Sequence, residues 1–110
     1  MKEHYDLFYK QGRAAREGEN IVFFYLLSDE SLKAIEQDSS LILNPDRISE
    51  FLKENGDNMH VFGLFLDGSK DIFDGIKTLK RLFNPKTISW WDRNMNKFFI
   101  LEVNKCQYQR

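Results

Sequence analysis

The chain has 110 residues, of which 42% are apolar and 15% aromatic, enough to fill the core of one domain. No run reaches the ~18 apolar residues of a membrane-spanning helix, and the first residues lack the apolar stretch of a secretory signal. The single cysteine, Cys106, excludes an internal disulfide framework and a zinc cluster. These features predict a cytoplasmic protein without a membrane span.

The net charge of −1 is divided unevenly along the chain. Residues 1–69 hold seven Lys and Arg against thirteen Asp and Glu, whereas residues 70–110 hold nine against four. The basic half is suited to meet an anion: a phosphate-bearing cofactor, a nucleic acid or an acidic protein. The same asymmetry would favour a homodimer. The alternative is that the two halves are merely solvated surfaces of opposite sign.

The first half of the chain alternates helix and strand signals. A helix is predicted over residues 4–17, with Tyr5 and Phe8 on its apolar face and Gly18 as its end; a strand over residues 13–16 is the alternative. The apolar run Ile21–Leu27 is typical of a strand buried on both faces. Two helices follow, over residues 30–37 with Ser28 or Asp29 as the cap, and over residues 46–55 with Asn44 as the cap and Pro45 at the first position. Residues 41–43 between them are too short to assign.

The second half predicts a strand, a helix and a hairpin. Residues 59–66 form a nearly continuous apolar run, and apolar side chains recur at helical spacing over residues 71–83 until Asn84-Pro85 ends the helix. Residues 87–91 and 97–103 then alternate as two strands around a polar turn. A helix between two buried strands implies a right-handed parallel crossover, with the hairpin at one edge. The sequence therefore predicts an α+β fold with a single mixed β-sheet and packed helices.

Residues in both halves resemble one family. The run Arg16–Tyr25, with Ser28 and a helix from Ser31, is similar to the central part of the bacterial toxin-activating lysine acyltransferases. Val61–Phe65, the Asp67-Gly68 turn and the helix that ends at Asn84-Pro85 fit the second half of that family, a divergent branch of the GNAT acyltransferase superfamily. The closing pattern Ile88–Phe98 is similar to small phage and mobile-element proteins. The resemblance covers roughly residues 11–100 and implies a single GNAT-like domain over residues 1–103, followed by a polar tail over 104–110.

The resemblance also implies where chemistry would be found, and most of those positions hold unsuitable residues. In that family a histidine and an aspartate transfer a fatty acyl group from acyl carrier protein to a lysine. The aspartate belongs where this chain has Gly63, and the only upstream histidine, His4, lies in a different context. The superfamily's pyrophosphate-binding loop for coenzyme A is replaced by Asp67-Gly68-Ser69-Lys70. There Gly68, Ser69 and Lys70 could hold a phosphate weakly.

We therefore expect no bound cofactor, and a protein without catalytic activity is the favoured interpretation. If it is an enzyme, it would be an acyltransferase that uses an acyl carrier protein or coenzyme A thioester, with His60, Asp67 and Tyr25 as the first catalytic candidates. A structural role is the simpler expectation for His60, because no second histidine or cysteine lies nearby in the sequence. Cys106 has only Lys105 beside it and is a weak candidate for a nucleophile.

The most unusual local cluster is Trp90, Trp91, Arg93 and Lys97. On a strand, one tryptophan faces the core and the other faces out. The outward one covers an edge or packs under the terminal tail, anchors a partner protein together with Arg93, or stacks on a nucleic-acid base with Arg93 and Lys97 on the phosphates. Near-neutral net charge makes nucleic acid an unlikely partner. The sequence thus predicts a GNAT-like protein that binds a partner protein; an active acyltransferase and a nucleic-acid-binding accessory protein are the alternatives.

Overall fold

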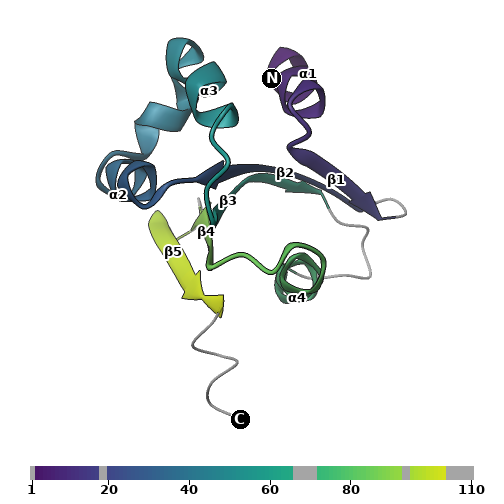
Figure 1. Ribbon diagram of the computed structural model, residues 1–110. Coiled ribbons are helices and arrows are strands. Elements are labelled where there is room, and N and C mark those ends of the chain that lie inside the picture. The colour runs from purple at the N-terminus through teal and green to yellow at the C-terminus, as the bar shows by residue number, and fades with distance from the viewer. Residues whose placement is uncertain (1, 18–19, 66–71, 93–94, 104–110) are drawn as a thin grey trace.

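The computed structural model describes residues 2–17, 20–65, 72–92 and 95–103, which form one five-stranded sheet with helices on both faces (Figure 1). The elements in chain order are α1 (Lys2–Lys10), β1 (Ala14–Glu17), β2 (Asn20–Leu27), α2 (Asp29–Gln37), the 3-10 helix η1 (Ser39–Leu43), α3 (Pro45–Leu52), β3 (Asn58–Phe65), α4 (Ile72–Phe83), β4 (Thr87–Asp92) and β5 (Lys97–Glu102).

The strands lie side by side in the order in which they occur along the chain. β3 and β4 are parallel and are joined through α4, and the other three neighbouring pairs are antiparallel. The predicted α+β fold with a single mixed sheet, its parallel crossover and its edge hairpin are confirmed.

The N-terminal helix is shorter than predicted. α1 ends at Lys10, and Gly12 follows with a φ of +70°, a conformation that L side chains rarely adopt and that ends the helix. The backbone N–H of Arg13 donates to the carbonyl of Phe8 at 2.8 Å, so the chain turns back directly into β1. The helix prediction is therefore wrong for residues 11–17, and the alternative strand over residues 13–16 agrees with β1 within one residue.

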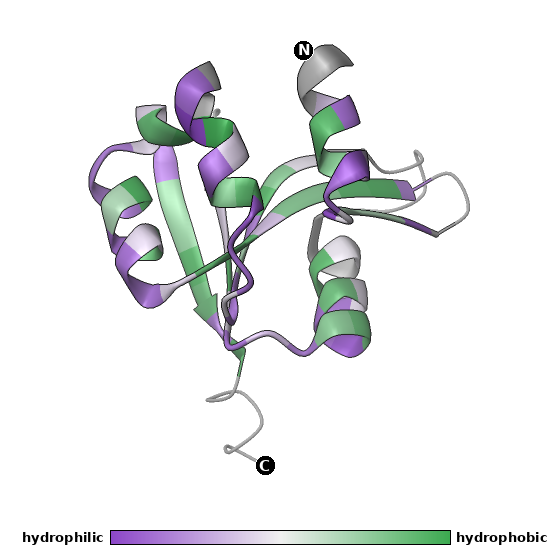
Figure 2. Cartoon of the chain, turned by 45° about the horizontal axis from the view of Figure 1, so that its top comes forward, coloured by the Kyte–Doolittle hydropathy of each residue, from purple (hydrophilic) through white to green (hydrophobic). Residues whose placement is uncertain are grey.

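The α1–α3 face of the sheet carries the larger core cluster. Its buried side chains come from β2 and from α1, α2, η1 and α3: Phe8, Phe23, Tyr25, Leu27, Leu32, Ile35, Ile42, Ile48, Phe51 and Leu52. Two of these helices are capped as predicted. The Ser28 hydroxyl accepts from the N–H of Ser31 at the start of α2, and the Asn44 side chain accepts from the N–H of Asp46 at the start of α3, where Pro45 is the first residue. Figure 2 shows the strands coloured mainly as apolar and the helices carrying both polar and apolar stretches.

The opposite face is covered by α4 alone among the described residues, as Figure 1 shows. Its buried cluster consists of Val22, Phe24, Met59, Val61, Ile76, Leu79, Ile88 and Val103. Trp90 and Leu101, from β4 and β5, pack against this cluster but are only partly buried. The two faces are thus unequally covered by the described helices, and the β4–β5 hairpin lies at the end of the sheet that is farther from α4.

The parallel ladder at the centre of the sheet is short. It joins four residue pairs, from Asn58 opposite Thr87 to Val61 opposite Trp90. Gly63 lies two residues further along β3, within the sheet as predicted, and pairs on the other side with Phe23 at a register shift of β2. β3 and β4 both continue beyond the point where their pairing ends.

Candidate functional site

His60 and Tyr25, two of the predicted catalytic candidates, lie side by side in the core. They are cross-strand partners on β3 and β2, and the His60 side chain also faces β4, where its Nδ1 atom lies 2.8 Å from the Ser89 hydroxyl. His60 is 1% exposed, and Tyr25 and Ser89 are 0% exposed. No substrate can reach these groups without displacing the core.

The environment of this row keeps its members neutral. Burial lowers the pKa of His60 to about 4, because the charged imidazolium would lose its hydration. Burial likewise raises the pKa of the Tyr25 phenol far above its ordinary value. The His60 ring stacks on Phe98 with an interplanar angle of 7°, and the Tyr25 hydroxyl donates to the carbonyl of Ile42. These contacts describe a structural polar row inside an aromatic core.

The remaining predicted acid–base and phosphate-binding positions either lie outside the described residues or hold a glycine. Asp67, Gly68, Ser69 and Lys70 lie outside the described residues. Gly63 lies on β3, where a glycine offers no group to orient a base or to take a proton. Among the parts of the chain that the structure describes, no three His, Cys, Asp or Glu side chains gather as a metal site.

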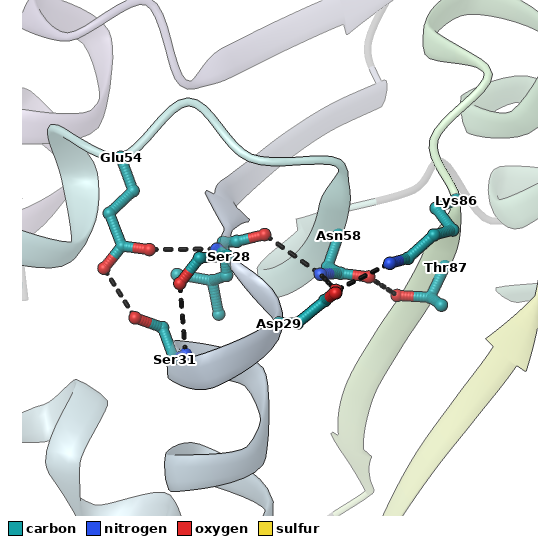
Figure 3. Close-up of polar contacts among 8 residues, drawn as sticks. Ser28, Asp29, Ser31, Glu54, Asn58, Lys86 and Thr87 are labelled. Atoms are coloured by element: carbon teal, nitrogen blue, oxygen red, sulfur yellow. Dashed lines mark hydrogen bonds and ion pairs between the residues drawn. The ribbon is translucent and has the colours of Figure 1, made fainter.

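A second polar cluster lies where β3 and β4 begin (Figure 3). Asn58 is 1% exposed; its amide donates to the carbonyl of Leu27 at 3.1 Å and to Asp29 at 2.8 Å, and it accepts from the Thr87 hydroxyl at 2.9 Å. Asp29 also pairs with Lys86 at 2.6 Å. The hydrogen bond from Lys86 is the main cause that lowers the pKa of Asp29, with the hydrogen bond from Asn58 second.

Glu54 completes this cluster from the other side of the α2 N-terminus. Its carboxylate accepts from the backbone N–H of Ser28 at 2.9 Å and from the hydroxyl of Ser31 at 2.6 Å (Figure 3). The cluster thus satisfies the helix start and ties α2 and the loop after α3 to the sheet. An open groove of about 480 Å³ adjoins it, lined by Asp29, Leu32, Lys33, Glu36, Asn58, Lys86, Thr87, Ile100 and Glu102. The groove combines charges of both signs with two apolar side chains and shows no arrangement for acid–base catalysis.

The β4–β5 hairpin separates the predicted partner-binding residues onto two faces. Trp91 is 38% exposed, and its pairing partner is Phe98, which lies on the α1–α3 side against His60. Trp90 lies on the α4 side, where its ring stacks on Phe99 at 5.4 Å and an interplanar angle of 14°. The two tryptophans face opposite sides of the sheet, as predicted: Trp90 packs partly buried against the α4-side cluster, and Trp91 is exposed.

Lys97 shares the α4 side with Trp90. Its ammonium group lies 5.3 Å from the centre of the Phe99 ring, within the range of a cation–π contact. Arg93 lies outside the described residues. The predicted set is therefore one hairpin with two chemically different sides rather than a single patch.

Sequence reasoning missed two exposed apolar residues of this hairpin and the polar cluster below it. Ile100 is 38% exposed and Met95 is 63% exposed. Strand alternation on an edge hairpin could have identified Ile100, because it shares a side with Phe98. Nothing in the local sequence indicates that Asn58 and Thr87 meet, since their contact depends on the parallel register.

Comparisons of the chain with protein-family models, with curated proteins and with solved structures find no match. No helix in the described residues is both long and apolar enough to cross a membrane.

Proposed function

We propose that the protein works by binding a partner protein through its β4–β5 hairpin. The observation that carries the proposal is the exposure of Trp91, Ile100 and Met95 on one edge hairpin, at 38%, 38% and 63%. Tryptophan is among the residues that contribute most to protein–protein affinity, and an apolar set at a sheet edge is a common interaction site.

The position of β5 supports this proposal. β5 is the last strand of the sheet, and no strand among the described ranges pairs with its outer side. An uncovered edge presents backbone N–H and C=O groups that a partner chain can pair with. The charged ends of β5, Lys97 and Glu102, are a common way to prevent nonspecific pairing of such an edge.

The same proposal includes a GNAT-like fold without the activity of that superfamily. The parallel β3–α4–β4 unit within an otherwise antiparallel sheet supports the fold assignment. Gly63 at the position expected for the acid and the burial of His60 and Tyr25 argue against proton transfer. The exposed hairpin is then a feature that a macromolecule could recognise.

The test compares partners captured by the wild-type protein and by Trp91→Ala/Ile100→Ala, with Tyr9→Ala as the matched control. Tyr9 is an exposed aromatic residue, 53% exposed, on α1. A partner retained by wild type and by Tyr9→Ala is then purified and its affinity measured by titration calorimetry. We expect the hairpin variant to weaken binding at least ~10-fold, as loss of a hot-spot residue does. Equal affinity of the hairpin variant and wild type would refute the proposal.

A second candidate, acyl transfer from a thioester, is favoured by the short parallel ladder. β3 extends past Val61 to Phe65 without a pairing partner on β4, and two parallel strands that part in this way leave backbone groups for an extended, amide-bearing arm. Coenzyme A and acyl carrier protein carry such an arm. A rise in Tm of several degrees with either ligand would support this candidate.

Salt-dependent binding of single-stranded or duplex oligonucleotides would instead favour a nucleic-acid partner.

A further inference from the structure

We infer that the α4 side of the hairpin docks an acidic amphipathic helix of the partner protein, which lies beside α4 and over β4 and β5. This inference goes beyond the proposed function, because Trp91 and Ile100 lie on the α1–α3 side of the hairpin whereas this surface lies on the α4 side.

The coverage of the sheet leaves room for one helix on this side. Five strands about 4.8 Å apart form a sheet roughly 24 Å wide, whereas a helix is about 10 Å across and covers about two strands. α1, α2, η1 and α3 contribute buried side chains to one face, but α4 is the only described helix on the other. Figure 1 shows α4 beneath one half of the sheet, away from β5. On this side the side chains of Val22, Phe24, Met59, Val61 and, on β4, Ile88 are buried, whereas those of Trp90, Phe99 and Leu101 are only partly buried.

The half that no described helix covers presents an aromatic floor. Trp90, Phe99 and Leu101 point to this side, as their ring stacking and their packing on the α4 cluster show. All three are only half-buried, in contrast to Val61 and Leu79 at 9% and 3% exposed. Flat, partly buried rings of this kind gain by burial under an apolar helical stripe.

The border of this floor is basic. At 100° per residue, Lys77 and Lys80 lie on one flank of α4 and Leu82 on the other, with Ile76 and Leu79 buried between them. In the right-handed connection of parallel strands, the flank with Lys77 and Lys80 faces β4.

On the opposite border Lys97 lies over Phe99, although its register partner Asp92 offsets part of its charge. A helix with an apolar stripe flanked by Glu or Asp therefore fits the floor and both borders. The seven residues after Val103 carry two basic side chains and no acidic one, so they lack the charge that this site favours.

The test uses two synthetic helical peptides of about five turns, each with a leucine stripe, one flanked by glutamates and the other by lysines. Titration calorimetry with the full chain should show saturable binding of the glutamate peptide that weakens several-fold as salt is raised. Lys77→Glu/Lys80→Glu should weaken it at least ~10-fold and should gain affinity for the lysine peptide. The matched control Lys33→Glu/Lys53→Glu, on α2 and at the end of α3, should bind as wild type does. Leu82→Ser, on the far flank of α4, should also leave binding unchanged.

Hydrogen exchange with the glutamate peptide bound should show protection in α4 and β5. Equal loss in the control variant, or no saturable binding, would overturn the inference. Saturable binding to vesicles of phosphatidylcholine and phosphatidylserine, without binding of the peptide, would assign the surface to a membrane and overturn the inference as well.

If the peptide does not bind while a partner still depends on Trp91, the proposed function stands and this inference is wrong. If the peptide binds but no partner depends on Trp91, the α4 side is a docking surface and the exposed side of the hairpin is not.

Discussion

The buried histidine makes the stability of the fold depend on pH in a predictable way. The folded pKa of His60 is about 4, below its ordinary value of 6.5, so the unfolded chain binds a proton that the native state rejects between these values. The stabilisation is therefore fully present above pH 6.5 and is lost as the pH falls toward 4. With one pKa unit equal to about 1.4 kcal/mol, the loss should reach about 2 kcal/mol by pH 5 and about 3 kcal/mol by pH 4.

The measurement compares wild type with His60→Asn, which keeps a hydrogen-bonding group near the Ser89 hydroxyl but does not titrate. Both proteins are unfolded in urea at several pH values between 4 and 7, and the free energies of unfolding are subtracted. Titration of all other groups cancels in the difference, and the cost of the smaller side chain adds only an offset that does not change with pH. We expect the difference to shrink by about 3 kcal/mol over this range. A constant difference, or an NMR titration of the His60 ring near 6.5 in the folded protein, would refute the reasoning. If His60→Asn does not fold, His60→Gln serves the same purpose.

Four further substitutions test the packing. Gly56→Ala should destabilise by about 3 kcal/mol in urea unfolding, because the added methyl would lie 2.2 Å from the backbone carbonyl oxygen of Leu27, which cannot move away. Asn58→Ala should cost about 2–4 kcal/mol by the same measurement, since it removes the buried hydrogen bonds of Asn58 to the Leu27 carbonyl and the Thr87 hydroxyl. Leu79→Ala should lower stability by about 2–4 kcal/mol and Leu82→Ala by under ~1 kcal/mol, as they are 3% and 54% exposed; similar losses would contradict the assigned orientation of α4.

Much of the architecture could be predicted from local patterns. The apolar run at residues 59–66 and the alternation around Trp90 each depend on physics within a few residues, namely burial on both faces of a strand and the period of two. Caps such as Ser28 and Asn44 are likewise local, because the side chain bonds a backbone N–H two or three residues ahead. The crossover followed from the chain order of strand, helix and strand.

The failures arose where long-range contacts decide the outcome. Residues 14–17 have a sequence that suits either helix or strand, and pairing with β2 selects the strand. Trp90 and Lys97 lie on the side of the hairpin that α4 covers, and Trp91 lies on the other side. No local pattern of residues 90–97 reveals which face of the sheet α4 covers. The bonds among Asn58, Thr87 and Asp29 require the parallel register of β3 and β4 and the start of α2 at one place.

The alternation of Trp90 and Trp91 gives the molecule two optical probes, one on each side of the sheet. They are the only tryptophans in the sequence, and adjacent residues of one strand face opposite sides. Replacing either one by phenylalanine leaves an indole whose emission depends on a single surface. A ligand that shifts the spectrum of one such variant and not of the other would thereby reveal which side it occupies, before any complex is seen.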